Sequence, residues 1–268
     1  MIKPRHRGQI RRWMGNVYYS CRRFFYWHYS ANIFAHRQDA NLPIEIFGHQ
    51  TPILRQLAKV DMYLQKNKAI NLELAIAKID GLVIEPGQTF SYWRLIGRPT
   101  KAKGYREGLI LRDGRVLSGI GGGLCQLSNS IYWTAIHTPL SIKERWRHSY
   151  DVFPDANRDQ PFGSGATCSY PNIDLQLKNN TQYSFQLRLT VVDGYLRACW
   201  FSDKELDNNY LVVEKDHEIK NEWWGGYSRN NKLFRQTINL QTGEVLEEEL
   251  LADNQAIMMY EPLLSNSQ

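Results

Sequence analysis

Several signatures of common protein classes are missing from this chain of 268 residues. Its four cysteines include no CxxC pair, which argues against structural zinc and against a dense disulfide framework. No apolar run approaches the ~18 residues of a membrane-spanning helix, and the N-terminal segment lacks the apolar core and cleavage site of a secretory signal. HExxH spacing and the Gly-Lys-Ser/Thr of a phosphate loop are also absent. These absences predict a cytoplasmic protein with free thiols and with no metal or cofactor.

Acidic residues are missing from the first 37 positions, although eight Lys and Arg residues lie there. The net charge of +6 therefore belongs to this arm, because the rest of the chain holds 25 basic and 27 acidic residues. Large aromatic residues accompany the arginines, most densely in Cys21–Tyr29. Such a segment suits an anionic membrane surface or nucleic acid, and the alternative is a helix that docks on the body. We expect peripheral contact with the inner membrane face, and no nucleic-acid partner.

The order of the predicted elements indicates an α+β fold rather than a doubly wound sheet. Two helices come first: one is capped by Thr51 and has Ile53, Leu57, Val60 and Leu64 on its apolar face, and the other runs from Asn71 to Gly81. The later elements, in order, are a strand at 82–84, a turn at 85–88, a hairpin at 108–118, a helix at 124–137, an extended segment at 142–153, strands at 173–177 and 183–189, and a hairpin turn at 193–194.

These elements divide the chain into three parts. Residues 1–45 form the basic aromatic arm, and residues 46–207 form an α+β body with an antiparallel sheet and a central helix. Residues 208–268 form a C-terminal extension that is rich in large apolar residues, so we expect it to pack on the body.

The most unusual stretch is Gly119–Trp133, in which three consecutive glycines lead into Cys125 at the start of the central helix. A thiol in the first helical turn feels the positive end of the helix dipole, which favours the thiolate. The glycines leave room for a substrate backbone, and free N–H groups there and at Cys125 can hold an oxyanion. The predicted ligand-binding residues are accordingly Gly121, Gly122, Gly123, Gln126 and Asn129.

A cysteine nucleophile needs a base, and His148 is the histidine that the pattern favours. If residues 142–152 are extended, His148 shares the apolar face with Trp146 and Tyr150. By analogy alone, a strand histidine beside a helix that opens with cysteine is typical of papain-like and transglutaminase-like enzymes. This predicts a Cys-His amide or ester hydrolase or acyltransferase, with Cys125 as nucleophile and His148 as base. The alternative is a buried core histidine beside a structural cysteine.

The sequence does not select a third residue to orient the histidine, although the logic of catalytic triads calls for an acid. Asp151 falls on the strand face opposite His148, and Asp174 falls on the polar side of its own strand. Asp159 lies in a loop that could fold over the cysteine. Asp159 and Asp174 are therefore the candidates that stay open.

Six motifs carry a resemblance to a known family: PGQTFSY (86–92), GIGGGLCQLS (119–128), RHSYDVFP (147–154), QPFGSGAT (160–167), DLQLKNNT (174–181) and EWWGGY (222–227). Through these motifs the chain resembles the VanW family, from about Arg55 to Pro262. Many members of that family carry Asp at the position that corresponds to Gly165, directly before the Ala-Thr of the fourth motif.

The resemblance implies an accessory role in glycopeptide (vancomycin) resistance or cell-wall metabolism, in clusters that replace the D-Ala-D-Ala terminus of cell-wall precursors. It also implies a cell-wall peptide or precursor as the ligand. Two hypotheses follow: a cysteine-dependent enzyme that acts on such a peptide, and a non-catalytic module that binds it.

Overall fold

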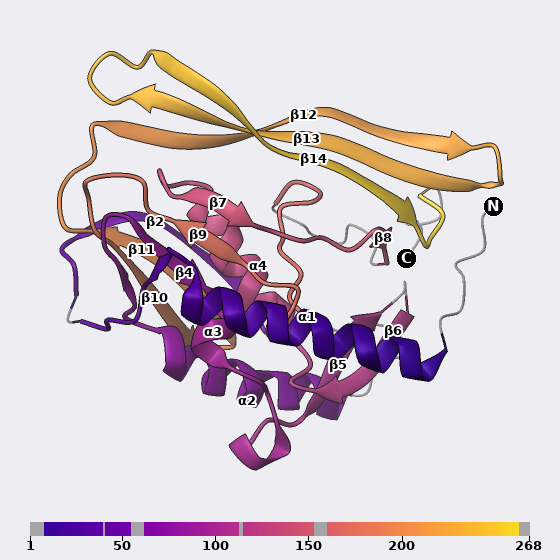
Figure 1. Ribbon diagram of the computed structural model, residues 1–268. Coiled ribbons are helices and arrows are strands. Elements are labelled where there is room, and N and C mark those ends of the chain that lie inside the picture. Colours follow the sequence, from indigo (N-terminus) through magenta and orange to yellow (C-terminus); the bar gives the residue numbers. More distant parts are fainter. Residues whose placement is uncertain (1–7, 40, 55–61, 113–114, 153–159, 263–268) are drawn as a thin grey trace.

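The computed structural model describes residues 8–39, 41–54, 62–112, 115–152 and 160–262 (Figure 1). Its fold is mixed α and β, as the order of elements predicted. The helices are α1 (Gln9–Tyr29), α2 (Met62–Ile79), α3 (Tyr92–Ile96) and α4 (Leu124–Ala135), with a 3-10 turn η1 (Lys101–Lys103). The strands are β1 (Ile33–Phe34), β2 (Ile44–Pro52), β3 (Val83–Ile84), β4 (Gln88–Ser91), β5 (Glu107–Arg112), β6 (Arg115–Ile120), β7 (Ser141–Glu144), β8 (Tyr150–Asp151), β9 (Gln176–Lys178), β10 (Phe185–Val192), β11 (Tyr195–Ser202), β12 (Asn208–Glu222), β13 (Gly226–Asn239) and β14 (Val245–Met258).

The strands form several small sheets rather than one continuous antiparallel sheet. Three sheets have four strands each, in the orders β1-β4-β9-β7, β2-β11-β10-β3 and β12-β13-β14-β8, and β5 pairs with β6 as a separate hairpin. Most pairs are antiparallel, but β1 with β4 and β14 with β8 are parallel. In Figure 1 the long ribbon of β12, β13 and β14 lies across the top and α2 across the bottom, with α4 between them.

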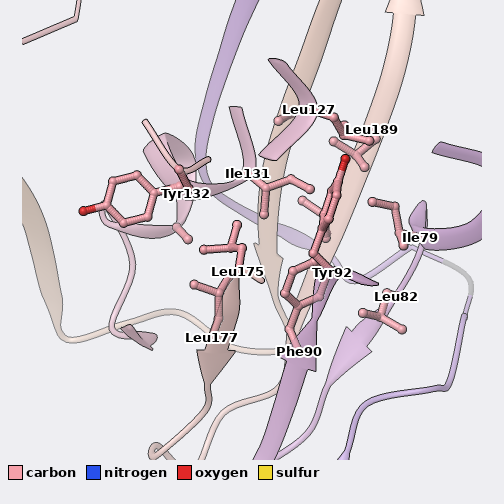
Figure 2. Close-up of a cluster of buried hydrophobic side chains, with 14 of the residues drawn as sticks. Ile79, Leu82, Phe90, Tyr92, Leu127, Ile131, Tyr132, Leu175, Leu177 and Leu189 are labelled. Carbon is pink, nitrogen blue, oxygen red and sulfur yellow. The ribbon is translucent and has the colours of Figure 1, made fainter. Parts of the chain in front are cut away.

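Helix α4 supplies the centre of the core. Leu127, Ile131 and Ala135 are fully buried on the face that the sequence spacing predicted. Leu127 and Ile131 pack in the same cluster as Tyr92 and Leu175, as Figure 2 shows. Because each buried leucine or isoleucine stabilises the fold by roughly 1.5–3 kcal/mol, the cluster fixes both the position and the rotation of α4.

The prediction of a helix that begins at Thr51 is wrong. Thr51 and Pro52 end strand β2, where they pair with Leu196 and Tyr195 of β11. The cap signal is local, and a ladder of backbone hydrogen bonds with a distant strand outweighs it. Two predicted members of that helix face, Leu57 and Val60, lie outside the described residues.

Asn71 does not start a second helix, because α2 runs through it without a break. Its side chain instead donates to the carbonyl oxygens of Arg106 and Gly122 and accepts from the Arg106 N–H. The predicted buried face of this helix is confirmed at Leu72, Ala75 and Ile79. The amide of Asn71 thus ties α2 to the glycine run.

The local turn signals are confirmed. The Gln88 N–H donates to the Glu85 carbonyl at 3.0 Å, with Gly87 at a φ of 78°. Strands β5 and β6 pair over their whole length, and β10 and β11 turn at Asp193 and Gly194, which both have positive φ. Glycine and Asp tolerate that left-handed conformation, so these turns follow directly from the residues.

The extended segment predicted at 142–153 is only partly regular. Strand β7 ends at Glu144 and β8 covers only Tyr150 and Asp151, so a strict alternation of faces fails between them. Arg145 turns inward, and its guanidinium donates to the carbonyl oxygens of Gly163 and Gly165. Trp146, predicted to face inward, is half exposed.

The N-terminal and C-terminal parts both contact the body. Arg23 of α1 forms a two-bond ion pair with Glu144, at 2.6 and 2.7 Å. Arg235 of β13 donates to the carbonyl oxygens of Thr138 and Leu140, just after α4. Within the described part of the chain, neither α1 nor another helix is both long and apolar enough to cross a membrane.

Candidate functional site

A cavity of about 290 Å³ opens beside the start of α4. Cys125, Asn129 and His148 line it, so the fold brings together three residues that the sequence singled out. Much of its wall is apolar, and these residues are Leu109, Ile110, Leu111, Val116, Val152 and Phe162. The cavity thus combines a largely apolar wall with a few polar side chains, which is the usual composition of a small-molecule or peptide site.

The glycine run builds the bend that leads into α4. Gly121 and Gly123 have φ values of 76° and 93°, a conformation that side chains rarely adopt. Gly122 packs directly on the backbone of β5: a Cβ atom there would lie 2.0 Å from the carbonyl carbon of Gly108. The three glycines are therefore required by the close approach of the chain to itself.

The same geometry argues against the glycine part of the predicted oxyanion site, while the part predicted for the Cys125 N–H stays a prediction. The N–H groups of Gly121, Gly122 and Gly123 donate to the carbonyl oxygens of Arg106, Gly119 and Leu109, at 2.9–3.0 Å. Since each donor is already used, none is available to a ligand. None of these three glycines is among the described residues that line the cavity.

Cys125 is half-buried at the first turn of α4, and its Sγ lies 3.7 Å from the carbonyl oxygen of Cys168. Burial raises the pKa of the Cys125 thiol above 9.0, and hydrogen bonds with the backbone of Cys168 and of Cys125 itself oppose this only in part. The position at the helix start, taken alone, predicts that the thiolate is favoured. In the folded protein desolvation is the larger effect, so the resting group at neutral pH is the thiol.

His148 faces the same cavity from the segment between β7 and β8. Burial lowers the pKa of its imidazole below 6.5, and the charge of the neighbouring Arg147 lowers it further. The ring is therefore neutral at neutral pH, which is the form that can accept a proton. It makes no hydrogen bond with the residues that the structure describes.

Asp151, which an alternation of strand faces would place opposite His148, lines the same cavity as His148. It is only 7% exposed and lines the cavity with Cys125 and His148. Tyr260 donates to its Oδ2 at 2.9 Å, and Arg229 lies 3.8 Å from the same oxygen. The alternation of faces that would separate Asp151 from His148 does not hold, because residues 145–149 are not a regular strand. Only the acidic residue type, so close in sequence to His148, could have signalled it.

The two candidates for the third catalytic residue, Asp174 and Asp159, have different outcomes. Asp174, predicted on the polar side of its strand, is fully buried and accepts from Ser91 Oγ at 2.6 Å and the Trp93 N–H at 2.9 Å. Burial raises its pKa to about 6, although these bonds oppose the rise. It holds β4 and α3 together and is not among the cavity residues. Asp159 lies outside the described residues.

Asn129 stands one helical turn after Cys125 on the same side of α4. Its Oδ1 accepts the Ala166 N–H at 2.8 Å, which sets the orientation of the amide. Its Nδ2 group has no acceptor among the described residues, so it can donate to a ligand in the cavity. By contrast, Gln126 donates to Thr51 Oγ1 and the Pro52 carbonyl, and its amide ties α4 to β2 instead.

Gly165 leaves room for the amide of Asn129. A Cβ atom at this position would lie 2.6 Å from Asn129 Oδ1, so an aspartate cannot occupy it while Asn129 holds the Ala166 N–H. In this chain an asparagine amide thus fills the space next to Gly165, and Asp151 lines the same cavity from another element.

Over the described ranges no three His, Cys, Asp or Glu side chains cluster in a way that would hold a metal ion. All four cysteines are free.

Comparison with known proteins supports one assignment. The family model described as VanW like protein matches residues 67–201. The chain is 34% identical over 222 residues to the "Vancomycin B-type resistance protein VanW" of Enterococcus faecalis, which covers 83% of this chain and 80% of that protein. It is 27% identical over 150 residues to the "Uncharacterized protein YoaR" of Bacillus subtilis, which covers 56% of this chain and about half (48%) of that protein. No solved structure matches the chain significantly.

Proposed function

The chain belongs to the VanW family, and from that premise we propose that it is a cysteine-dependent acyl-transfer or hydrolytic enzyme that acts on cell-wall peptides in glycopeptide resistance or cell-wall metabolism. The name of the enterococcal relative, which associates that protein with vancomycin resistance, supports the biological setting. The observation that carries the chemistry is that Cys125 and His148 line one cavity. By fold-level analogy, a cysteine at a helix start facing a histidine works as in papain-like and transglutaminase-like enzymes.

In the first half-reaction Cys125 Sγ attacks the carbonyl carbon of an amide or ester while its proton passes to His148. The C–N or C–O bond then breaks, the leaving group takes the proton from His148, and a thioester remains on Cys125. Because the resting pair is a neutral thiol and a neutral imidazole, the proton moves during the attack rather than before it.

In the second half-reaction a water molecule, or the amine or hydroxyl of an acceptor, attacks the thioester with His148 again as the base. Hydrolysis releases a carboxylic acid, transfer releases a new amide or ester, and the thiol is restored in both cases. Asp151 supports the imidazolium that forms in each step through its negative charge, since it is buried and lines the same cavity.

Asn129 is the best-placed donor for the oxyanion of the tetrahedral intermediates. Its Nδ2 group stands one turn from Cys125, and its Oδ1 is held by Ala166, so the amide is preoriented before substrate binds. A fixed side-chain amide of this kind is worth roughly 10²–10³ in kcat in other hydrolases. It takes the part of the oxyanion site that was first predicted for the N–H groups of the three glycines, beside the N–H of Cys125.

The test is turnover and labelling with purified protein. Muropeptides are incubated with wild type, Cys125→Ser, His148→Ala and the control Cys21→Ser, which changes an exposed cysteine on α1. Mass spectrometry should detect a cleaved or transferred product, and an acyl adduct on Cys125, with wild type and Cys21→Ser only. Equal product from Cys125→Ser would refute the proposal.

A specific observation also favours the second candidate, a non-catalytic module that binds cell-wall peptide or precursor. The raised pKa of Cys125 and the engaged glycine N–H groups are what a structural loop beside a binding cavity would have. Calorimetric titration with the same muropeptides separates the two. Saturable binding that Cys125→Ser retains, with no turnover by wild type, would establish the module.

A further inference from the structure

Helix α1 exposes a continuous apolar stripe. Every third or fourth residue along it is apolar, so these side chains share one face of the helix. Trp13 is 66% and Phe25 is 65% exposed, and the whole stripe consists of Ile10, Trp13, Met14, Val17, Tyr18, Cys21, Phe24 and Phe25. Single exposed apolar residues are ordinary, but a contiguous row of this length marks an interaction surface.

The opposite face of α1 is fixed to the body near its C-terminal end. Trp27 is buried and donates to Ser91 Oγ at 3.1 Å, and Tyr26 donates to Gln176 at 2.9 Å. Together with the Arg23–Glu144 ion pair, these contacts set the rotation of the helix. The stripe is therefore held on the outside of the molecule, where Figure 1 shows α1 running along the surface.

Positive charge borders the stripe. Arg11 and Arg22 are exposed and lie eleven residues apart, which is about three helical turns and places them on one side of the helix. Helix α1 contains no Asp or Glu, and the sequence outside the first 37 residues is slightly acidic. The surface thus combines an apolar face, several aromatic rings and arginines that have no Asp or Glu beside them on α1.

We propose that this stripe lies in the interfacial region of an anionic lipid bilayer, so that α1 is a peripheral membrane anchor. Tryptophan, tyrosine and phenylalanine favour the headgroup level, and arginines beside them bind anionic lipid. Nucleic acid offers no partner for Ile10, Met14 and Val17, which are aliphatic. A second copy of the chain would bring two sets of arginines together without an acid between them.

Vesicle flotation of the full chain tests the proposal, with phosphatidylcholine vesicles that either contain or lack phosphatidylglycerol. The stripe variant carries Val17→Asp and Phe25→Asp. The matched control carries Val192→Asp and Leu240→Asp, which place the same charge change on exposed apolar residues elsewhere. Wild type and the control should float with the anionic vesicles, and the stripe variant should bind at least about tenfold more weakly, because two apolar insertions are lost.

A third variant, Arg11→Gln with Arg22→Gln, tests the charge without touching the stripe. It should weaken binding to anionic vesicles and leave binding to pure phosphatidylcholine unchanged. Failure of wild type to float, or flotation of the stripe variant equal to wild type, would overturn the proposal. So would light scattering that finds a wild-type dimer made monomeric by the stripe variant, together with no flotation of either, because the occupant would then be a second copy.

Discussion

Acidification should act on the fold through His137, the buried histidine that follows α4. Its ring is 7% exposed and stacks on Phe47 with 3.8 Å between centroids, and its Nδ1 lies 2.8 Å from the Trp133 carbonyl oxygen. Burial lowers the pKa of His137 from 6.5 to about 4, although the hydrogen bond to Trp133 opposes the change. The charged imidazolium is thus strongly disfavoured in the folded protein.

The sign and size of the effect of His137 on the free energy of unfolding follow from proton linkage. Above pH 6.5 the ring is neutral in both states, so it does not affect stability. As the pH falls from 6.5 to about 4 the unfolded chain takes up a proton that the folded chain does not, so stability is lost. The two pKa values differ by about 2.5, which corresponds to a loss of about 3 kcal/mol.

Asp174 acts in the opposite direction over nearly the same range. Burial raises its pKa from 3.8 to about 6, so the folded protein holds a proton that the unfolded chain has released. Stability therefore rises by about 3 kcal/mol as the pH falls from 6 to 3.8. The two titrations nearly cancel, and these two groups together should leave wild-type stability almost flat between pH 6.5 and 4.

His137→Phe should remove one side of this balance and keep the stacking on Phe47. We expect the free energy of unfolding of this variant, from urea titrations followed by fluorescence, to increase by about 3 kcal/mol relative to wild type between pH 7 and pH 4. The control is His28→Phe, because the exposed His28 makes the same kind of contact with the carbonyl four residues before it. A change with pH that is the same in wild type and His137→Phe would refute the reasoning.

Three further outcomes can be measured. Asn129→Asp keeps the acceptor for the Ala166 N–H but removes the Nδ2 donor, so kcat on a muropeptide substrate should fall by roughly 10²–10³, and an unchanged kcat would remove Asn129 from the mechanism. In thermal unfolding, Gly122→Ala should lower the free energy of unfolding by at least about 3 kcal/mol or prevent folding, because its Cβ would meet the backbone of Gly108. In the same experiment the control Gly15→Ala, which lies in open space on α1, should be neutral or stabilising by up to about 1 kcal/mol. Alkylation of Cys125 by iodoacetamide, followed by peptide mapping, should stay slow at neutral pH and rise only under alkaline conditions, because burial raises the pKa of its thiol. Faster labelling of Cys125 than of the exposed Cys21 at pH 7 would contradict the raised pKa.

The elements that the sequence predicted well are those whose signals are short-range. The apolar spacing of Leu127 and Ile131 was enough to place α4, and with it Cys125 at a helix start. The Asp-Gly and Pro-Gly turns were equally secure, because few residues adopt the required φ values. The family followed from the motifs themselves, which need no three-dimensional information.

Short-range signals predict only some of the residues that line the cavity. Cys125, His148 and Asn129 could be selected by residue type and spacing, and all three line the cavity. Asp151 could not, because its direction depends on the irregular backbone of residues 145–149, where Arg145 donates to the carbonyl oxygens of Gly163 and Gly165. A rule of alternating faces assumes a regular strand, and that assumption failed at this point.

The sequence by itself determined the helix that presents the cysteine, the turns and the family, because each rests on neighbours within a few residues. Only the tertiary structure decided that Thr51 ends a strand, that the glycine N–H groups are already bonded and that burial raises the pKa of Cys125. Hydrogen-bond partners and local dielectric come from residues distant in the chain. A donor or a thiol therefore has no fixed chemistry until the fold has brought those residues to it.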